Sequence, residues 1–477
     1  MKKTIAKNSF FNIIYTVSNI LFPFLTSIYV SRILMPAGVG KVAGAQNIAS
    51  YFVTIAALGL PSYGVREFAK IRDSKKERNT LFTELIIINI VSTTVVTIAY
   101  VVFLYFNHGF KGEWTLYGAC GLLIILNYLN IDWVYQGLEE YGYIAGRNIA
   151  IKAISLLFLF CFVRSPADYV KYALISSLAT GGNYIFNVIH SRKFVRLSFK
   201  GIQPLRHLKS VILIAAILFL SSIYSKIDIT MLNVLATYES VGYYSYAQKT
   251  VNIVITLAAA VTAALLPRLS YYFENDMSAF YKLIDKGYQV LCLAVIPLCI
   301  GLFMVADQVV VFLYGEAFIP TAVTIRLMCP IILIKGFGDL LCYQMVYSTK
   351  NEKVLLPAST CASVINVIVN AILIPHLLQN GAVIASVVSE FVTNAIQLSY
   401  VKRRVHFSVR IKPLVVSAVS TVCMAISVLL IMKIHVPNFG GLVLEIIIGV
   451  CVYFLINIVL KNELIWDVMN KLRSRTD

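Results

Sequence analysis

The sequence predicts an all-α integral membrane protein with about 14 transmembrane helices, arranged as two six-helix lobes followed by a C-terminal helix pair. Three observations predict this fold class: the composition, the alternating charge of the loops and an internal repeat. Of the 477 residues, 59% are hydrophobic and only 13% are charged, whereas soluble domains average about 45–50% apolar and about 25% charged residues. Because a spanning helix needs about 20 apolar residues, the chain has no room for a large soluble domain.

The apolar segments follow one another with short polar connections between them. The first run is too long for the apolar region of a signal peptide, so we expect it to stay as the first helix. Apolar runs of this length predict single crossings of a bilayer. The predicted spans are residues 9–33, 40–60, 81–106, 115–136, 144–163, 168–190, 210–236, 243–266, 287–306, 319–346, 354–375, 381–401, 413–432 and 440–460.

Basic residues gather in alternate connections. The richest stretches are residues 66–78, 192–209 and 402–412. The opposite set of connections is nearly bare and carries Arg32, Lys111, Arg164 and Lys433. The positive-inside rule therefore predicts that both termini are cytoplasmic and that the number of spans is even. Cytoplasmic loops that face anionic lipid also explain the net charge of +18, so we expect no nucleic-acid partner.

An internal repeat divides the spans into two sets. Residues 39–46 match residues 241–248 at an offset of 202 positions, with Val, Gly, Ala and Gln shared at the first, second, seventh and eighth places. Because these segments lie in the second and eighth spans, they predict two parallel lobes. The predicted divisions are residues 1–200, 201–405 and 406–477. Transporters commonly have such repeats, with the substrate site between the lobes near the midplane.

Charged side chains inside the predicted spans cost about 2.5 kcal/mol or more each in hydrocarbon, so we expect them to face a cavity or a partner. The candidates for a substrate cavity are Lys226, Asp228, Lys249, Arg326, Arg32 and Lys41. A cationic cavity suits an anionic substrate, because lysine and arginine both bind phosphate groups. Snorkelling to a membrane interface is the alternative explanation, above all for Lys41.

Four acidic residues within the spans are candidates for coupling transport to an ion. They are Glu84, Asp132, Asp339 and Glu390, and they would bind a proton or Na⁺. The nine cysteines form no C-x-x-C pair and the six histidines are scattered, so no metal site is expected. The chain has no G-x-x-x-x-G-K-S/T loop for ATP, and the outside loops are short. We therefore expect no enzyme activity and no cofactor, apart from a coupling ion.

Four motifs resemble those of one transporter family. Residues 32–40 resemble its R-x-L-x-P-x-x-x-G turn after the first helix, and residues 59–67 its G-x-x-x-Y-G-x-R-E helix end. Residues 226–244 resemble its D-x-x-M-L … V-G-x-Y pattern, and residues 366–386 its N-x-x-x-N-x-x-L-I-P … G-A-x-I-A-T pattern. From about residue 8 to 405 the chain thus resembles the polysaccharide-transporter (Wzx-like) branch of the multidrug/oligosaccharidyl-lipid/polysaccharide (MOP) flippases.

The resemblance implies a MATE-like fold, alternating access through a cationic central cavity, and flipping of undecaprenyl-diphosphate-linked oligosaccharide repeat units across the bacterial inner membrane. Such flipping serves capsule, O-antigen or exopolysaccharide synthesis, so lipid-linked oligosaccharide, membrane lipids and polymerase machinery are the implied partners. A monomer is expected because two lobes already form a complete pathway. The alternatives are a cation-coupled multidrug exporter of the same superfamily, a flippase of peptidoglycan lipid intermediates and a membrane polysaccharide polymerase. The first helix has no charge before Arg32, which argues against the peptidoglycan substrate.

Overall fold

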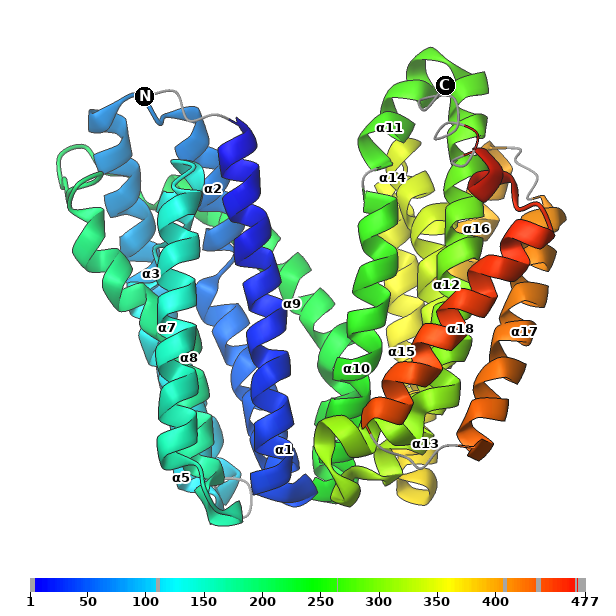
Figure 1. The fold of residues 1–477 in the computed structure, drawn as a ribbon. Coiled ribbons are helices and arrows are strands. Elements are labelled where there is room, and N and C mark those ends of the chain that lie inside the picture. The colour runs from blue at the N-terminus through cyan, green and yellow to red at the C-terminus, as the bar shows by residue number, and fades with distance from the viewer. Residues whose placement is uncertain are drawn as a thin grey trace. The chain divides into compact units, whose positions relative to one another are not determined.

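A computed structural model of the chain describes residues 5–108, 112–263, 265–405, 410–434, 439–467 and 470. These residues form helices and connections without a strand, as the sequence predicts (Figure 1). Contacts within the chain define two compact units, unit 1 (Met1–Val234) and unit 2 (Leu235–Asp477). The three divisions predicted from the sequence rest on the repeat and stay a prediction.

Unit 1 is built from long helices joined by short ones. Its helices are α1 (Ile5–Ala57), α2 (Leu60–Lys70), α3 (Lys75–Phe106), α5 (Trp114–Leu126), η1 (Asn127–Leu129), α6 (Asp132–Gly137), α7 (Tyr141–Phe162), η2 (Pro166–Asp168), α8 (Tyr169–Ser191) and α9 (Leu205–Leu235). The last residue of α9 falls in unit 2.

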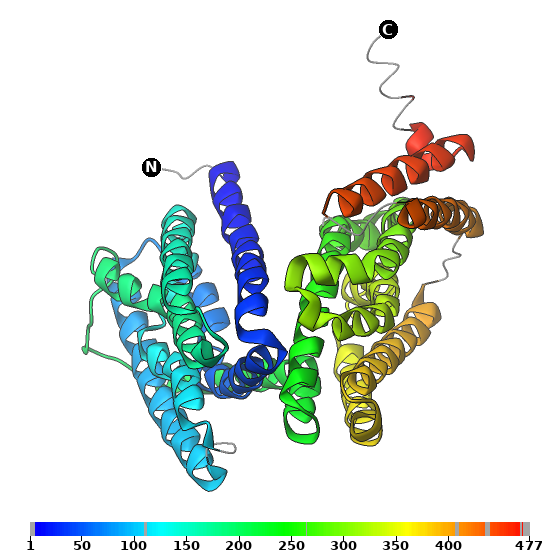
Figure 2. The same cartoon turned by 60° about the horizontal axis from the view of Figure 1, so that its bottom comes forward.

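Unit 2 continues the same pattern. Its helices are α10 (Tyr238–Ala263), α11 (Leu266–Asn275), α12 (Met277–Tyr314), η3 (Glu316–Phe318), α13 (Pro320–Gly338), η4 (Asp339–Gln344), α14 (Met345–Ser348), η5 (Glu352–Val354), α15 (Leu355–Leu377), α16 (Gln379–Arg404), α17 (Ile411–Ile434) and α18 (Phe439–Val459). The last two pack on each other and on α12 along one side of the unit (Figures 1 and 2). Tyr453 of α18 donates to the Leu293 carbonyl of α12 at 2.8 Å.

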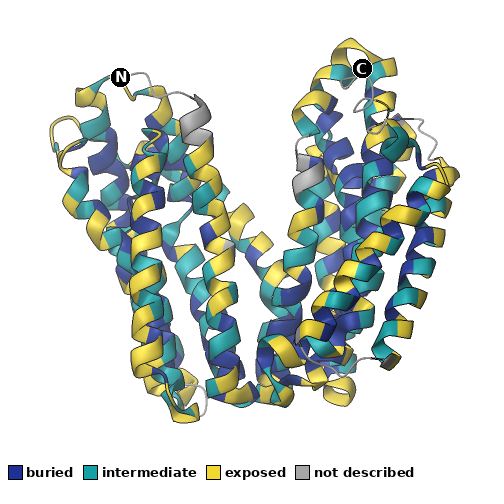
Figure 3. Cartoon of the chain, viewed as in Figure 1, coloured by how far each residue is buried: buried dark blue, intermediate teal, exposed yellow. Residues whose placement is uncertain are grey.

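Nine of the described helices are long and apolar enough to cross a membrane by themselves. The second half of α1 and the helices α5, α8, α10 and α13 complete the predicted fourteen. Exposed residues run along these helices (Figure 3). They include large apolar side chains such as Val95 and Val101 on α3 and Ile426 and Leu430 on α17. Hydrocarbon would cover such surfaces, so the chain is a multi-pass membrane protein.

The predicted turn between the first two spans lies inside α1. Met35 interrupts the helix with φ 58° and ψ 171°, and Pro36 starts the next helical segment. A residue before proline is disfavoured in the α conformation, which explains why the break falls here. The first span therefore ends at Leu34, close to the boundary predicted from the sequence.

Two predicted spans are broken rather than continuous. The span predicted at 115–136 changes from α5 to η1 at Asn127. Buried side-chain amides form hydrogen bonds to the backbone and side chains at this break. Asn89 donates to the Asn127 carbonyl at 2.8 Å, and Asn127 donates to Thr93 at 2.9 Å. The span predicted at 319–346 ends as α-helix at Gly338 and continues as the π-helical η4 from Asp339. Side-chain hydrogen bonds of this kind make broken helices tolerable at membrane depth.

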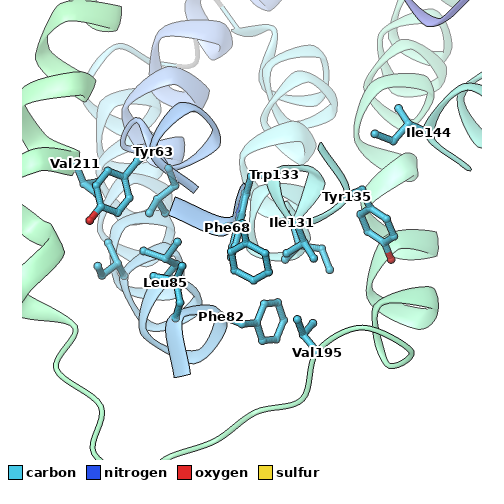
Figure 4. Close-up of a cluster of buried hydrophobic side chains, with 14 residues drawn as sticks. Tyr63, Phe68, Phe82, Leu85, Ile131, Trp133, Tyr135, Ile144, Val195 and Val211 are labelled. Atoms are coloured by element: carbon cyan, nitrogen blue, oxygen red, sulfur yellow. The ribbon is translucent and has the colours of Figure 1, made fainter. Parts of the chain in front are cut away.

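The short helices α2 and α6 close one end of unit 1 around Trp133. Figure 4 shows Phe68 and Phe82 beside the Trp133 ring, with centroid distances of 5.1 and 6.1 Å. Gly64 lies so close to this ring that a Cβ would come within 2.7 Å of Trp133 Cδ2. Because Trp133 is only 1% exposed, the ring has no room to withdraw.

We predict that Gly64→Ala lowers the stability of the protein by about 1–3 kcal/mol, the usual cost of overpacking a close-packed core. Gly146→Ala is the matched control, because a Cβ at Gly146 would meet nothing within 4 Å and alanine favours a helix. Thermal unfolding of the detergent-solubilised protein measures both. Equal melting temperatures for the two variants would contradict the packing of Gly64 against Trp133.

Candidate functional site

Within the spans predicted from the sequence, most basic residues pair with a carboxylate of the described residues. Each of these ion pairs joins a lysine or arginine to an aspartate or glutamate of the same unit. The pairs are Lys41–Glu113 at 2.5 Å, Arg147–Asp132 at 3.2 Å, Lys171–Asp168 at 2.6 Å, Lys335–Glu390 at 2.9 Å and Arg326–Asp307. Lys152, Lys226 and Lys249 differ, because no carboxylate of the described residues pairs with them. We call these three the unpaired lysines.

Lys226 lies on α9 and contacts the second half of α1. Its ammonium donates to Ser50 Oγ at 2.9 Å and lies 5.8 Å from the centre of the Tyr51 ring. Asn47 holds the two helices together, donating to Thr230 Oγ1 at 2.7 Å and to the Lys226 carbonyl at 3.2 Å. The side chain is half-buried. The contacts of its ammonium among the described residues are thus a hydroxyl and an aromatic face rather than a carboxylate, which leaves it able to attract an anion.

Lys152 occupies a similar environment on α7. Its ammonium donates to the Ser18 carbonyl at 3.2 Å and to Asn19 Oδ1 at 2.5 Å, both on the first half of α1. Asn148, one turn earlier, donates to Ser18 Oγ at 3.0 Å. Lys152 was not among the predicted cavity residues, although its charge inside a predicted span was the signal that could have identified it.

Lys249 lies on α10 in unit 2. Its ammonium is 4.8 Å from the centre of the Tyr246 ring, one turn earlier on the same helix. The unpaired lysines thus include two predicted cavity residues, Lys226 and Lys249, and they occur in both units. Asp228, predicted beside Lys226, is a buried side chain of α9.

The other predicted cavity residues have different surroundings. Arg326 of α13 pairs with Asp307 of α12 and also donates to the Phe303 carbonyl at 3.3 Å. Lys41 pairs with Glu113, which accepts a further hydrogen bond from Tyr169 at 2.9 Å. Arg32 is exposed on the last turn before the break in α1. Their role as cavity residues stays a prediction.

Two of the four predicted ion-coupling residues meet in one polar cavity of unit 2. Asp339 and Glu390 line a cavity of about 210 Å³ between α10, α13, η4 and α16. Lys335 also lines it and pairs with Glu390 rather than with Asp339, its neighbour four residues along the chain. Asp339 accepts hydrogen bonds from Thr262 and, at 2.8 Å, from Gln344. The π-helical turn places Asp339 in this cavity, and such turns occur frequently at functional sites.

The other two predicted ion-coupling residues, Glu84 and Asp132, lie in unit 1 and accept hydrogen bonds from other protein groups. Glu84 is fully buried and accepts hydrogen bonds from the Gln203 amide at 2.7 Å, from Arg206 at 2.6 Å and from His207 at 2.8 Å. Asp132 accepts from Arg147 and Asn187. With several donors each, these carboxylates fasten helices and connections of unit 1, which favours a structural role.

Two family profiles match long stretches of this chain. The profile of the family described as "Polysaccharide biosynthesis protein" matches residues 5–273, more than half of the chain. The chain belongs to the polysaccharide biosynthesis protein family. A second profile, described as "Lipid II flippase MurJ", matches residues 153–451. The resemblance to the Wzx-like branch of the MOP superfamily is thereby confirmed.

Two curated relatives align over most of this family member. "Probable low-salt glycan biosynthesis flippase" of Haloferax volcanii is 22% identical over 393 residues, which cover 80% of this chain and 82% of the relative. "Putative O-antigen transporter" of Escherichia coli K12 is 20% identical over 409 residues, which cover 84% of this chain and 97% of the relative. Both relatives carry the names of transporters rather than enzymes.

Solved structures confirm the MATE-like fold. The inward closed conformation of the lipid II flippase MurJ has a TM-score of 0.73 at 16% identity, covering 95% of this chain and 100% of that one. An inward-facing multidrug resistance MATE family transporter of the MOP superfamily has a TM-score of 0.64 at 14% identity, covering 80% and 94%. At such identities the likeness extends to the fold alone.

We predict that Glu84→Gln lowers the stability of the protein by about 2 kcal/mol, because a neutral amide replaces a buried carboxylate that accepts charge-assisted hydrogen bonds. Glu77→Gln, an exposed change on the same helix, is the control and is expected to cost well under 1 kcal/mol. Denaturation followed by fluorescence of the three tryptophans reports both. A Glu84→Gln protein as stable as the control would refute the structural role.

Proposed function

We propose that this protein flips undecaprenyl-diphosphate-linked oligosaccharide repeat units across the bacterial inner membrane by alternating access. The unpaired lysines are the observation that carries the proposal. A charge in a membrane helix is costly unless a partner neutralises it. Five other basic residues in the predicted spans have a carboxylate partner. Lys152, Lys226 and Lys249 have none among the described residues, so a bound anion would stabilise them.

A diphosphate matches these lysines chemically. An ammonium is a compact charge with three donors, and it binds phosphate oxygens through charge-assisted hydrogen bonds. The lysines occur in both units, so each unit contains a cation of the kind that binds phosphate. The lipid tail would stay in hydrocarbon while the polar head crosses between the lobes. Membership of the polysaccharide biosynthesis family supports this substrate class, and the proposal involves no covalent step.

The cavity around Asp339 is our candidate for ion coupling. Its two carboxylates and single ammonium give it a formal charge of −1, so it would attract Na⁺ or a proton. A multidrug exporter would use an acidic site of this kind for organic cations. Here the Lys335–Glu390 pair already neutralises one carboxylate, and the unpaired lysines require an anion, so the flippase function is favoured.

The basic connections and the two lobes bear on the orientation and the oligomeric state of the protein. We propose that both termini are cytoplasmic, because the basic connections then lie inside. We further propose that the protein acts as a monomer beside polysaccharide polymerase machinery, since one chain contains both lobes.

We predict that replacing the unpaired lysines reduces export of the lipid-linked sugar. Lys226→Ala and Lys249→Ala should each lower the flipping rate about tenfold, because a lost hydrogen bond to a charged group costs about 1.5–3 kcal/mol. Lys433→Ala is the matched control, since Lys433 is exposed at the end of α17. The assay measures, in intact cells, how much lipid-linked oligosaccharide a membrane-impermeant glycosidase can reach, and immunoblots check insertion. Wild-type flipping by both variants would reject the site.

Deletion of the gene tests the function itself. Loss of a flippase should trap lipid-linked oligosaccharide facing the cytoplasm, whereas loss of a polymerase would leave unpolymerised units on the outer face. The same glycosidase assay separates the two results. Accumulation on the outer face would contradict the proposal.

We predict that Asp339→Asn abolishes stimulation of flipping by an imposed Na⁺ or proton gradient in proteoliposomes, because the amide removes the negative charge that would attract the cation. Asp285→Asn is the control, since Asp285 is a partly exposed residue of α12 in the same unit, where it pairs with Arg410. If the Asp339→Asn protein responds to both gradients like the control, the coupling site lies elsewhere.

A further inference from the structure

A second cavity of unit 2 has a different chemistry from the lysine sites. It has a volume of about 470 Å³ and lies between α11 and the stretch from α14 to η5. Figure 1 shows α11 and α14 side by side, and the two helices contact each other. Both belong to connections that the positive-inside rule predicts to be cytoplasmic. Its size is within the range of ligand pockets, about 300–1,000 Å³.

Tyrosine rings form the apolar part of this cavity. Tyr271 of α11 lines it although its side chain is 62% exposed, and Tyr347 of α14 lines it from the other side. Tyr347 packs on Tyr343 with ring centroids 4.7 Å apart, and their hydroxyls are 3.3 Å apart. Tyr343 in turn lines the cavity around Asp339. The paired rings thus join this cavity to the cavity around Asp339.

The polar groups of the cavity favour a neutral ligand rich in hydroxyls. Glu274 and Glu352 line it together with Ser270, and its one lysine, Lys350, is paired with Glu274. This hydrogen bond raises the pKa of Lys350 above its ordinary value, so the lysine stays charged and bound to the carboxylate. With more carboxylate than ammonium, the cavity repels a diphosphate or an anionic lipid headgroup. Carboxylates accept hydrogen bonds from hydroxyl groups.

A sugar presents both features that the cavity complements. Its hydroxyls donate to carboxylate oxygens, and the C–H groups of its ring faces are apolar enough to pack on exposed aromatic rings. We propose that this tyrosine cavity, defined by Tyr271, Tyr347, Glu274 and Glu352, binds the saccharide part of the lipid-linked substrate before it is flipped. This inference rests on the proposed function and divides substrate recognition in two. The unpaired lysines bind the diphosphate, and the tyrosine cavity selects the sugar.

Two probes separate these roles in binding measurements on the purified full-length protein in nanodiscs. The first is the lipid-linked repeat unit extracted from a polymerase-deficient strain, and the second is undecaprenyl diphosphate without sugar. The Tyr271→Ala/Tyr347→Ala double variant is expected to bind the first probe about tenfold more weakly and the second as the wild type does. Lys226→Ala is expected to weaken both. Tyr105→Ala, an exposed tyrosine of α3, is the control and should change neither.

Conservative variants test the same assignment without removing the rings. Tyr347→Phe keeps the aromatic face and should bind both probes nearly as the wild type does, whereas Glu352→Gln, at an exposed position, should weaken only the glycosylated probe. If the tyrosine and glutamate variants weaken both probes equally or neither, the saccharide site is refuted and the proposed function survives. If the wild type binds neither probe and flips no lipid-linked sugar, the proposed function itself fails.

Discussion

The structure depends on one constraint, the cost of leaving charge or an unpaired backbone group in hydrocarbon. Ion pairs between neighbouring helices meet this cost for most of the basic residues in the spans, as in Arg147–Asp132 and Lys335–Glu390. Where a helix breaks, amide side chains form hydrogen bonds with the freed backbone groups, as Asn89 does with the Asn127 carbonyl. Lys152, Lys226 and Lys249 differ from these residues, because none of them pairs with a carboxylate in the part of the chain that the structure describes.

The same constraint distinguishes a carboxylate enclosed by protein donors from one that lines a cavity. Glu84 is saturated by donors from Gln203, Arg206 and His207, so it fastens the start of α9 to α3. Asp339 has fewer donors and faces a cavity that a cation could enter. Glu84 is therefore enclosed by protein donors, whereas Asp339 borders a cavity, and this difference in surroundings distinguishes the two carboxylates.

Substrate recognition in a lipid-linked sugar flippase involves two unlike ligand groups in one molecule. A diphosphate needs cations, and a saccharide needs hydrogen-bond acceptors and aromatic faces. Unit 2 contains both chemistries at different places, with Lys249 on α10 and the tyrosine cavity between α11 and α14. Under the proposed function, the two parts of the substrate would therefore be recognised at separate places in this unit.

The sequence alone determined the membrane class, the number and order of the spans and the family, because these follow from hydrophobic run length, loop charge and local motifs. It also marked Lys226 and Lys249 as unusual, since a charge in an apolar run is visible without a structure. It could not decide which charges are neutralised. Lys335 pairs with Glu390 of α16 instead of Asp339, which is four residues further along the chain. Arg326 of α13 pairs with Asp307 of the neighbouring helix α12. Only the tertiary structure decided these partners, because helix packing brings together side chains that are distant in the chain.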